Sequence, residues 1–130
     1  MKRIVSLGPV HNQITAPAVT AGHLVEDYRH AVVDVLTVGA TGNLKVKVSN
    51  QDAKPDFAAP ATVTNQWSYI DLKGRNDGGT TIVGTSGLTL PGTGSSSYAV
   101  NTDAVRWIAV DVETLSAGNV SVLLSGATNE

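Results

Sequence analysis

The sequence predicts an all-β protein, an antiparallel β-sandwich and, most specifically, an eight-stranded jelly roll. Short runs rich in Val, Thr and Ile recur along the chain, and Gly, Asn, Asp and Pro separate them at intervals of roughly ten residues. No window places apolar residues at helical spacing over a full helix length between capping residues. Eight or nine strands at this spacing are typical of a sandwich or barrel, and an immunoglobulin-like topology stays open as the alternative.

Length and composition favour a single domain over residues 1–130. A chain of this size can bury about two-thirds of its unfolded surface in one core. Charged residues make up 15% of the sequence and the net charge is −2, so we expect no nucleic-acid partner, which would require a basic surface. Cysteine is absent, which excludes disulfides, thiolate catalysis and cysteine-based zinc sites.

The first residues resemble a signal peptide only briefly. The apolar run that follows Met1-Lys2-Arg3 ends at Gly8-Pro9, which is too short for the apolar region of a signal. No run approaches the ~18 apolar residues that a membrane helix needs. We therefore expect a soluble protein that is made in the cytoplasm without a secretion signal and has no membrane partner.

The first strands of the predicted sandwich are less regular than the later ones. Runs at 2–7 and 14–21 are extended, and Pro17 confines the second to an edge or an arm. Residues 1–20 therefore form either an N-terminal arm that orders on a neighbouring molecule or the first edge strands. The runs 28–38 and 44–49, joined by a glycine-rich link, predict a hairpin.

Alternation in the run 44–49 places Leu44, Val46 and Val48 on one face and Lys45, Lys47 and Ser49 on the other. After a loop at 50–60, strands are expected at 61–72, 80–83, 88–90 and 97–101. The segment 91–96 is expected to be a flexible loop, and 23–30 one helical turn.

The end of the chain predicts a second hairpin, with strands at 105–113 and 119–125. The inward residues expected from alternation are Ile108, Val110, Val112, Val120, Val122 and Leu124. Trp107 and Leu123 then lie on the outer faces of these strands. A half-apolar outer face needs a cover, either a loop of the same chain or a partner.

One cluster has the composition of a metal site: His23, Glu26, Asp27 and His30. On a helix, this spacing would bring two imidazoles and a carboxylate to one side, a set that can hold a divalent metal. The segment has no helix cap, so a polar link into the next strand is the preferred interpretation. We expect no metal and no other cofactor.

Catalytic patterns are missing as well, so we expect a protein that is not an enzyme. No G-x-S-x-G nucleophile elbow occurs. Residues 92–97 share only their glycines with a phosphate loop, because the Lys-Ser/Thr pair is missing. The acids with a candidate role in glycosidic cleavage fall on polar strand faces or turns: Asp71, Asp103, Asp111 and Glu113.

The aromatic residues support an alternative function, a carbohydrate-binding or receptor-binding module. Trp67 and Tyr69 share a predicted strand face with Asp71, an arrangement suited to stacking on a sugar ring and bonding its hydroxyls. Aromatic residues are only 5% of the chain, however, and the same tryptophans are equally needed to fill a core or an interface.

Two stretches resemble the strands of small β-sandwich proteins from tailed-bacteriophage virions. These are VRWIAVDVETLSAGNVSVLLSG at 105–126 and WSYIDLKG at 67–74. In size and style the chain resembles the jelly-roll cement, or decoration, proteins of phage capsids. This resemblance implies a non-enzymatic structural protein on the capsid surface of the virion, bound to the major capsid protein as a small homo-oligomer, a dimer or trimer.

Without a reactive site, function would reside in edges, loops and a terminal arm. We therefore expect partner contacts at apolar residues of the N-terminal segment and of the outer faces of the last two strands: Ile4, Val5, Leu7, Val10, Ile14, Trp107 and Leu123.

Overall fold

Two long strands organise the fold. A computed structural model, which describes residues 3–75 and 79–128, pairs β4 (His30–Ser49) with β10 (Trp107–Thr128) in an antiparallel ladder. All the other strand pairs are antiparallel too, so the predicted all-β class is confirmed. No helix in the described part of the chain is long and apolar enough to cross a membrane.

The sheet folds over into two layers because β4 and β10 each belong to both. The first half of β4 and the second half of β10 lie in the first sheet, and their other halves lie in the second. The remaining strands of the first sheet are β1 (Arg3–Ile14), β9 (Gly92–Asn101), β6 (Leu72–Gly74) and β7 (Thr81–Ile82). Those of the second are β2 (Ala18–Val19), β3 (His23–Leu24), β5 (Ser68–Ile70) and β8 (Leu88–Thr89).

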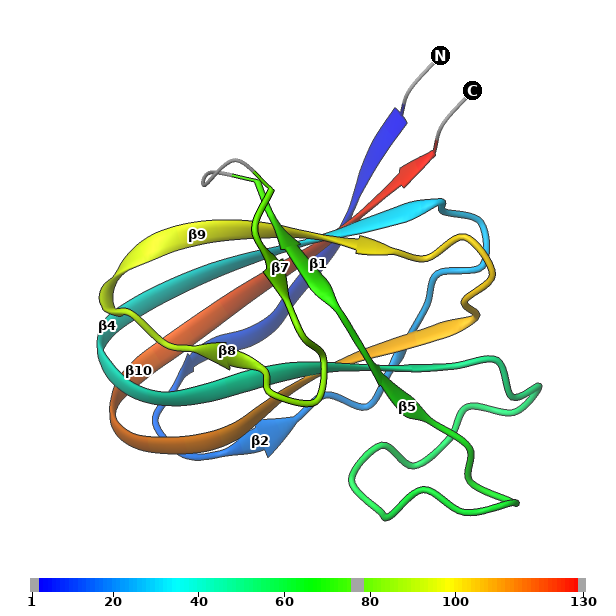
Figure 1. Ribbon diagram of the computed structural model, residues 1–130, viewed down its shortest axis with the longest axis horizontal. Coiled ribbons are helices and arrows are strands. Elements are labelled where there is room, and N and C mark those ends of the chain that lie inside the picture. Colours follow the sequence, from blue (N-terminus) through cyan, green and yellow to red (C-terminus); the bar gives the residue numbers. More distant parts are fainter. Residues whose placement is uncertain (1–2, 76–78, 129–130) are drawn as a thin grey trace.

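Figure 1 shows β4 and β10 curving round together where they pass from one layer to the other. Gly39 and Gly118 have φ of 59° and 74° in these bends, values that suit glycine because it lacks a Cβ. The backbones also nest closely, since a Cβ on Gly118 would lie 2.3 Å from the carbonyl carbon of Gly39. The glycines therefore let two neighbouring strands turn a corner side by side.

Both predicted hairpins are wrong, because β4 and β10 each continue through their bend and pair with each other. The runs on either side of each glycine link do not pair with one another. Instead Val38 faces Asn119 and Leu44 faces Val112, with bulges in β10 between these points. A bulge bends a strand without reversing its direction, whereas a hairpin turn reverses it. Glycine and other turn residues in the sequence are compatible with either one.

Three shorter predictions are also corrected. The strand expected at 61–72 begins only at Ser68, because Thr62 and Asn65 close a turn through reciprocal backbone hydrogen bonds of 3.0 and 3.3 Å. The loop expected at 91–96 instead belongs to β9, where Ser95 and Ser96 pair with β4. The helical turn expected at 23–30 is β3 followed by a turn at Glu26 and Asp27.

The core lies between the layers and is made largely of branched aliphatic residues. The predicted inward positions of the last two strand runs are confirmed, since each is at most 2% exposed: Ile108, Val110, Val112, Val120, Val122 and Leu124. Phe57 and Leu72 are equally buried. Complete burial of such a side chain stabilises the fold by about 1.5–3 kcal/mol.

The N-terminal segment is an edge strand in this structure. β1 pairs with β10 from Arg3, opposite Thr128, to Ile14, opposite Val120. The beginning of β1 and the end of β10 therefore lie side by side, as Figure 1 shows.

Candidate functional site

The outer face of the second sheet is covered by residues 50–67, a segment between β4 and β5 that we call the excursion. Lys47 lies beneath it and is only 6% exposed. Its Nζ donates to the Phe57 carbonyl at 2.8 Å, pairs with Asp111 at 3.2 Å and lies 4.1 Å from the centre of the Trp67 ring. Buried ammonium groups need such partners, and here they fasten the excursion to the sheet.

Further contacts hold the excursion in place. The indole N–H of Trp67 donates to the Ala59 carbonyl, and that of Trp107 donates to the Gln51 carbonyl, both at 2.9 Å. Phe57 is 2% exposed and packs on Gly22, where an added Cβ would lie 2.8 Å from its ring. The cover over Trp107 is therefore a loop of the same chain.

The residues of the carbohydrate alternative have internal partners. Trp67 and Tyr69 meet edge to face, with ring centres 5.3 Å apart, and Lys45 lies 4.9 Å from the Tyr69 ring centre. Asp71 has a separate task, since its carboxylate accepts the Gly84 N–H at 2.7 Å. A sugar platform needs an open ring face, and Lys47 occupies one face of Trp67.

The outer face of the first sheet differs, because no segment in the described part of the chain lies across it. We call this surface, formed by β1, β9 and the adjoining halves of β4 and β10, the open face. Four large apolar side chains on it are 40–62% exposed: Ile4, Leu36, Val38 and Leu123. The strand register surrounds them with small polar residues such as Ser95 and Ser121. Exposed apolar groups gathered on one sheet face indicate an interaction surface.

A shallow hollow of about 190 Å³ lies in the open face. Its apolar lining is Pro9, Val35, Leu36, Val122 and Leu123, and its polar lining is His11, Asn12, Asp34, Ser95 and Ser121. Register shifts in β1 on both sides of Pro9 bend this strand beside the hollow. A second hollow of about 180 Å³ on the same face includes Ile4 and Val32.

His11 closes one side of the larger hollow and points away from solvent. It is 5% exposed, and its Nε2 lies 3.0 Å from the Val110 carbonyl. A carbonyl oxygen can only accept, so Nε2 carries the proton in this contact. The imidazole therefore ties β1 to the second sheet.

The structure divides the expected partner-contact residues into exposed and packed groups. Ile4 and Leu123 stand on the open face, at 62% and 40% exposure. Val5 and Trp107 are half-buried. Three others pack against the core from β1: Leu7, Val10 and Ile14. In this conformation Ile4 and Leu123 are exposed on the open face and available for contact. Leu7, Val10 and Ile14 belong to the edge strand β1 but pack against the core.

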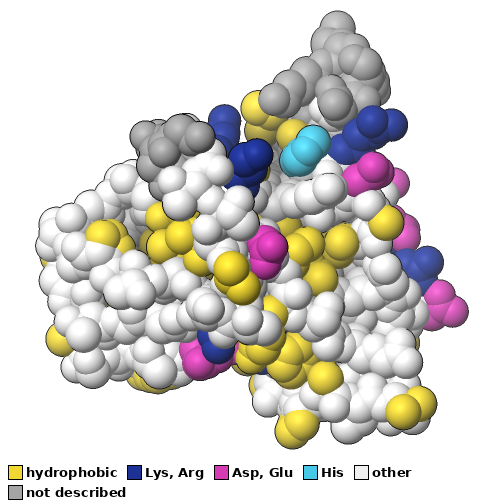
Figure 2. Space-filling model, in the orientation of Figure 1, with side chains coloured by type: hydrophobic (Ala, Val, Ile, Leu, Met, Phe, Trp, Pro, Cys, Tyr) yellow, Lys and Arg dark blue, Asp and Glu magenta, His cyan; other side chains and the backbone are white. Residues whose placement is uncertain are grey.

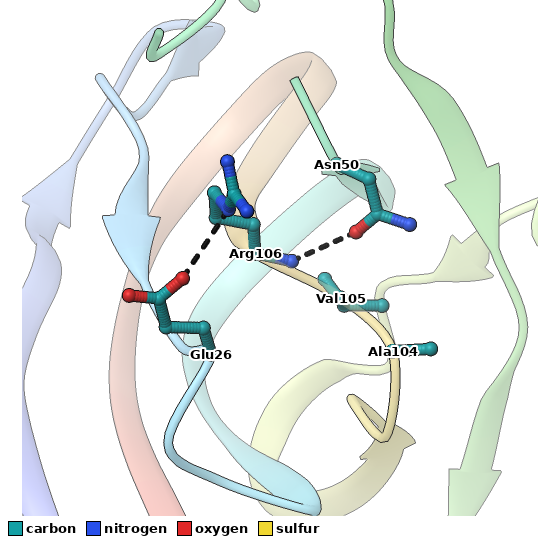
Figure 3. A pocket seen from close by; sticks show the side chains of 5 residues that line it. All are labelled: Glu26, Asn50, Ala104, Val105 and Arg106. Carbon is teal, nitrogen blue, oxygen red and sulfur yellow. Dashed lines mark hydrogen bonds and ion pairs between the residues drawn. The ribbon is translucent and has the colours of Figure 1, made fainter. Parts of the chain in front are cut away.

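Loops at one end of the sandwich form another pocket, of about 230 Å³, shown in Figure 3. Arg106 points across it, with its Nε 3.2 Å from Glu26 and its backbone N–H donating to Asn50 at 3.0 Å. A hydrogen bond to Asp52 raises the pKa of Arg106 above its ordinary value. Two carboxylates already neutralise this guanidinium, so the pocket is not a free anion site.

The histidine-carboxylate cluster does not assemble a metal site. Across residues 3–75 and 79–128, no group of three or more His, Asp or Glu side chains is placed to hold a metal ion. Glu26 pairs with Arg106, and burial, together with the charge of Lys54, lowers the pKa of His23. Because its pKa is lowered, His23 is a neutral side chain in β3 of the second sheet.

Two features of the site were missed by sequence reasoning. In the alternation of 44–49, Lys47 is expected to face solvent, and nothing in that pattern signals that the following loop folds back and buries it. Asp34 left a clearer signal, since it is the one charge inside the apolar run 31–36.

Figure 2 shows one side of the molecule, on which most of the surface is uncharged and many of the charged side chains stand toward the upper right.

No protein-family model and no curated protein matches the chain. Solved structures do. The chain is similar to the crystal structure of SPBc2 prophage-derived protein YomS, with a TM-score of 0.72 and 11% identity over 98% of this chain and 96% of YomS. It is also similar to the PBSX exported protein XepA, with a TM-score of 0.72 and 16% identity over 98% of this chain.

These similarities establish the fold. The class defined by fold and site is an antiparallel β-sandwich with one covered and one open face. The same fold is found in the SPBc2 prophage-derived protein YomS and in the PBSX exported protein XepA. The chain spans 38% of XepA, so it corresponds to one part of that protein.

Proposed function

We propose that this chain is a non-enzymatic structural protein of a tailed-phage virion that binds the outside of the capsid shell and stabilises it. Its partner would be the major capsid protein. The observation that carries this proposal is the open face, with exposed Leu36, Val38 and Leu123 on a weakly charged sheet whose opposite counterpart is fastened under its own loop.

Two further findings support a virion role. The fold is shared with proteins from prophages, which makes a phage context reasonable. The hollow of the open face is lined by five apolar residues and five polar ones, with Asp34 as the one acid among them, a mixture that suits a protein contact. The proposal places the protein on the capsid surface as a small homo-oligomer, a dimer or trimer.

Purified protein added to shells that lack it tests the proposal. We expect it to sediment with the shells and to raise the temperature at which they lose their integrity. An unrelated β-sandwich protein of similar charge is the control for trapping. Shells that neither bind the protein nor gain stability would overturn the proposal, and selective retention on a glycan array would support the carbohydrate alternative instead.

A further inference from the structure

Asp34 is the unmatched charge of the open face. It lies near the middle of the face, opposite Leu123 on β10 and Ser97 on β9. The side chain is half-buried, and no hydrogen bond or ion pair reaches its carboxylate from the residues described. The other face handles its charges differently, since Asp111 pairs with Lys47 and Glu113 pairs with Lys45.

The nearby ionisable groups do not neutralise Asp34. His11 turns inward to the Val110 carbonyl. Arg75, which reaches this face from the end of β6, donates from its guanidinium to the Ser97 hydroxyl at 3.2 Å. Among the residues that the structure describes, none pairs with this half-buried carboxylate on an apolar surface, an arrangement that favours a cationic partner once water is displaced.

The hollow beside Asp34 has the size for one apolar side chain. Its volume is about 190 Å³, and a cavity of roughly 150 Å³ is enough to hold benzene. Leu36 and Leu123 line the hollow from neighbouring strands, and Val35 and Val122 also contribute to its lining. An aliphatic group entering here would bury these exposed methyl groups, and a neighbouring cation would reach Asp34.

We propose that the open-face hollow is a docking site for a partner protein segment that presents an aliphatic side chain next to a lysine or arginine, which pairs with Asp34. This proposal rests on the proposed function, because the capsid protein is the partner it describes, and it adds the chemistry of the contact. The partner's basic group should face the centre of the first sheet.

Two substitutions with matched controls test the contact on shells that lack the protein. Asp34→Lys reverses the charge and should weaken binding at least about tenfold, and Leu123→Asp should do the same by placing a charge in the hollow. Asp103→Lys makes an equal charge change in an exposed loop, and Val63→Asp makes the equal apolar-to-acid change on the excursion, where Val63 is 86% exposed. Both controls should bind as the unaltered protein does.

A second assay needs no shells. The methyl resonances of Leu36 and Leu123 are followed while the full chain is titrated with N-acetylated, amidated Leu-Arg or Leu-Glu dipeptides. We expect saturable shifts with Leu-Arg that weaken in Asp34→Lys, and smaller shifts with Leu-Glu.

The outcomes separate this inference from the proposed function. If shells bind the unaltered protein and both open-face variants equally, the docking site is overturned while the shell function stands. If shells do not bind but the two dipeptides are discriminated, the docking chemistry stands and the shell function fails. Equal response to both dipeptides overturns the inference, as does a wild-type oligomer that Leu123→Asp dissociates, because the occupant would then be a second copy of the chain.

Discussion

The two outer faces of this sandwich share the strands β4 and β10, but one face is covered by a loop and the other is exposed. On the second sheet, Lys47, Trp107 and Asp111 take part in holding the 50–67 excursion, and Trp67 of the excursion donates to Ala59 within it. On the first, Leu36 and Leu123 stay exposed, and Asp34 has no hydrogen-bond or ion-pair partner among the described residues. The difference shows that a chain with few reactive residues can still mark its binding surface, by covering one face and leaving the other available.

The covered face yields the largest expected effect. Replacing Lys47 by Ala leaves Asp111 half-buried without its cation and releases the Phe57 carbonyl. Removing one member of a buried pair costs about 3–5 kcal/mol, so unfolding by urea should shift by that free energy. Lys47→Met, which keeps the packing volume, should lose less. A Lys47→Ala variant as stable as the unaltered protein would mean that the excursion is not fastened through this residue.

The shared bends can be tested next, because both faces depend on them. Gly118→Ala places a Cβ 2.3 Å from the Gly39 backbone and should destabilise the fold by ~3 kcal/mol, within the range of severe single changes. Gly92 also has a positive φ, of 86°, but nothing lies within 4 Å of its missing Cβ. Gly92→Ala should therefore lose only about 1–2 kcal/mol, the cost of the left-handed backbone alone.

Calorimetric melting of the two variants gives this comparison directly. Equal losses of stability in the two variants would show that the close approach of β4 and β10 at Gly39 and Gly118 does not contribute to the stability of the fold.

Substitutions of Trp67 test whether this residue holds the excursion on the sheet or forms a platform for a sugar ligand. Trp67→Ala removes the ring that Lys47 contacts and the N–H that Ala59 accepts, so we expect a loss of about 2 kcal/mol and faster proteolysis within the excursion. Trp67→Phe should restore part of this stability. A variant with unchanged proteolysis but lost glycan retention would reverse the assignment of the two faces.

The smallest expected effect concerns pH. The pKa of His23 is lowered from 6.5, chiefly by burial, so the folded state binds its proton more weakly than the unfolded state does. Stability from this residue is thus complete above the unfolded pKa and is lost as the pH falls below it toward the folded pKa.

The urea midpoint of the unaltered protein should decline from pH 7.5 to pH 5.0, and His23→Gln should make that decline shallower. Identical slopes would show that His23 does not link protonation to folding at this end of the covered face.

Prediction from sequence succeeded where the signal was local. Period-two alternation in the runs 105–113 and 119–125 identified the buried residues, because strand side chains alternate whatever the partner strand is. It failed at Gly39 and Gly118, since a glycine link permits a hairpin or a bend equally. It also failed at 91–96, where glycine and serine are held in β9 by pairing with β4.

The candidate site divides in the same way. Leu123 was placed on an outer face by alternation alone, whereas Asp34 was not singled out, although it is the one acid inside the apolar run 31–36. Which outer face would be covered was not visible, because the covering loop meets Trp107 and Gly22, which are distant from it in sequence, only in the folded chain.

Local alternation and the absence of helical periodicity were thus enough to predict the strand class and the inward residues. Three features became known from the folded chain alone: β4 and β10 continue through their bends, Lys47 is buried, and the first sheet stays open. These outcomes depend on which distant segments pair, and strand pairing over long separations is set by the packing of the whole chain rather than by any local pattern.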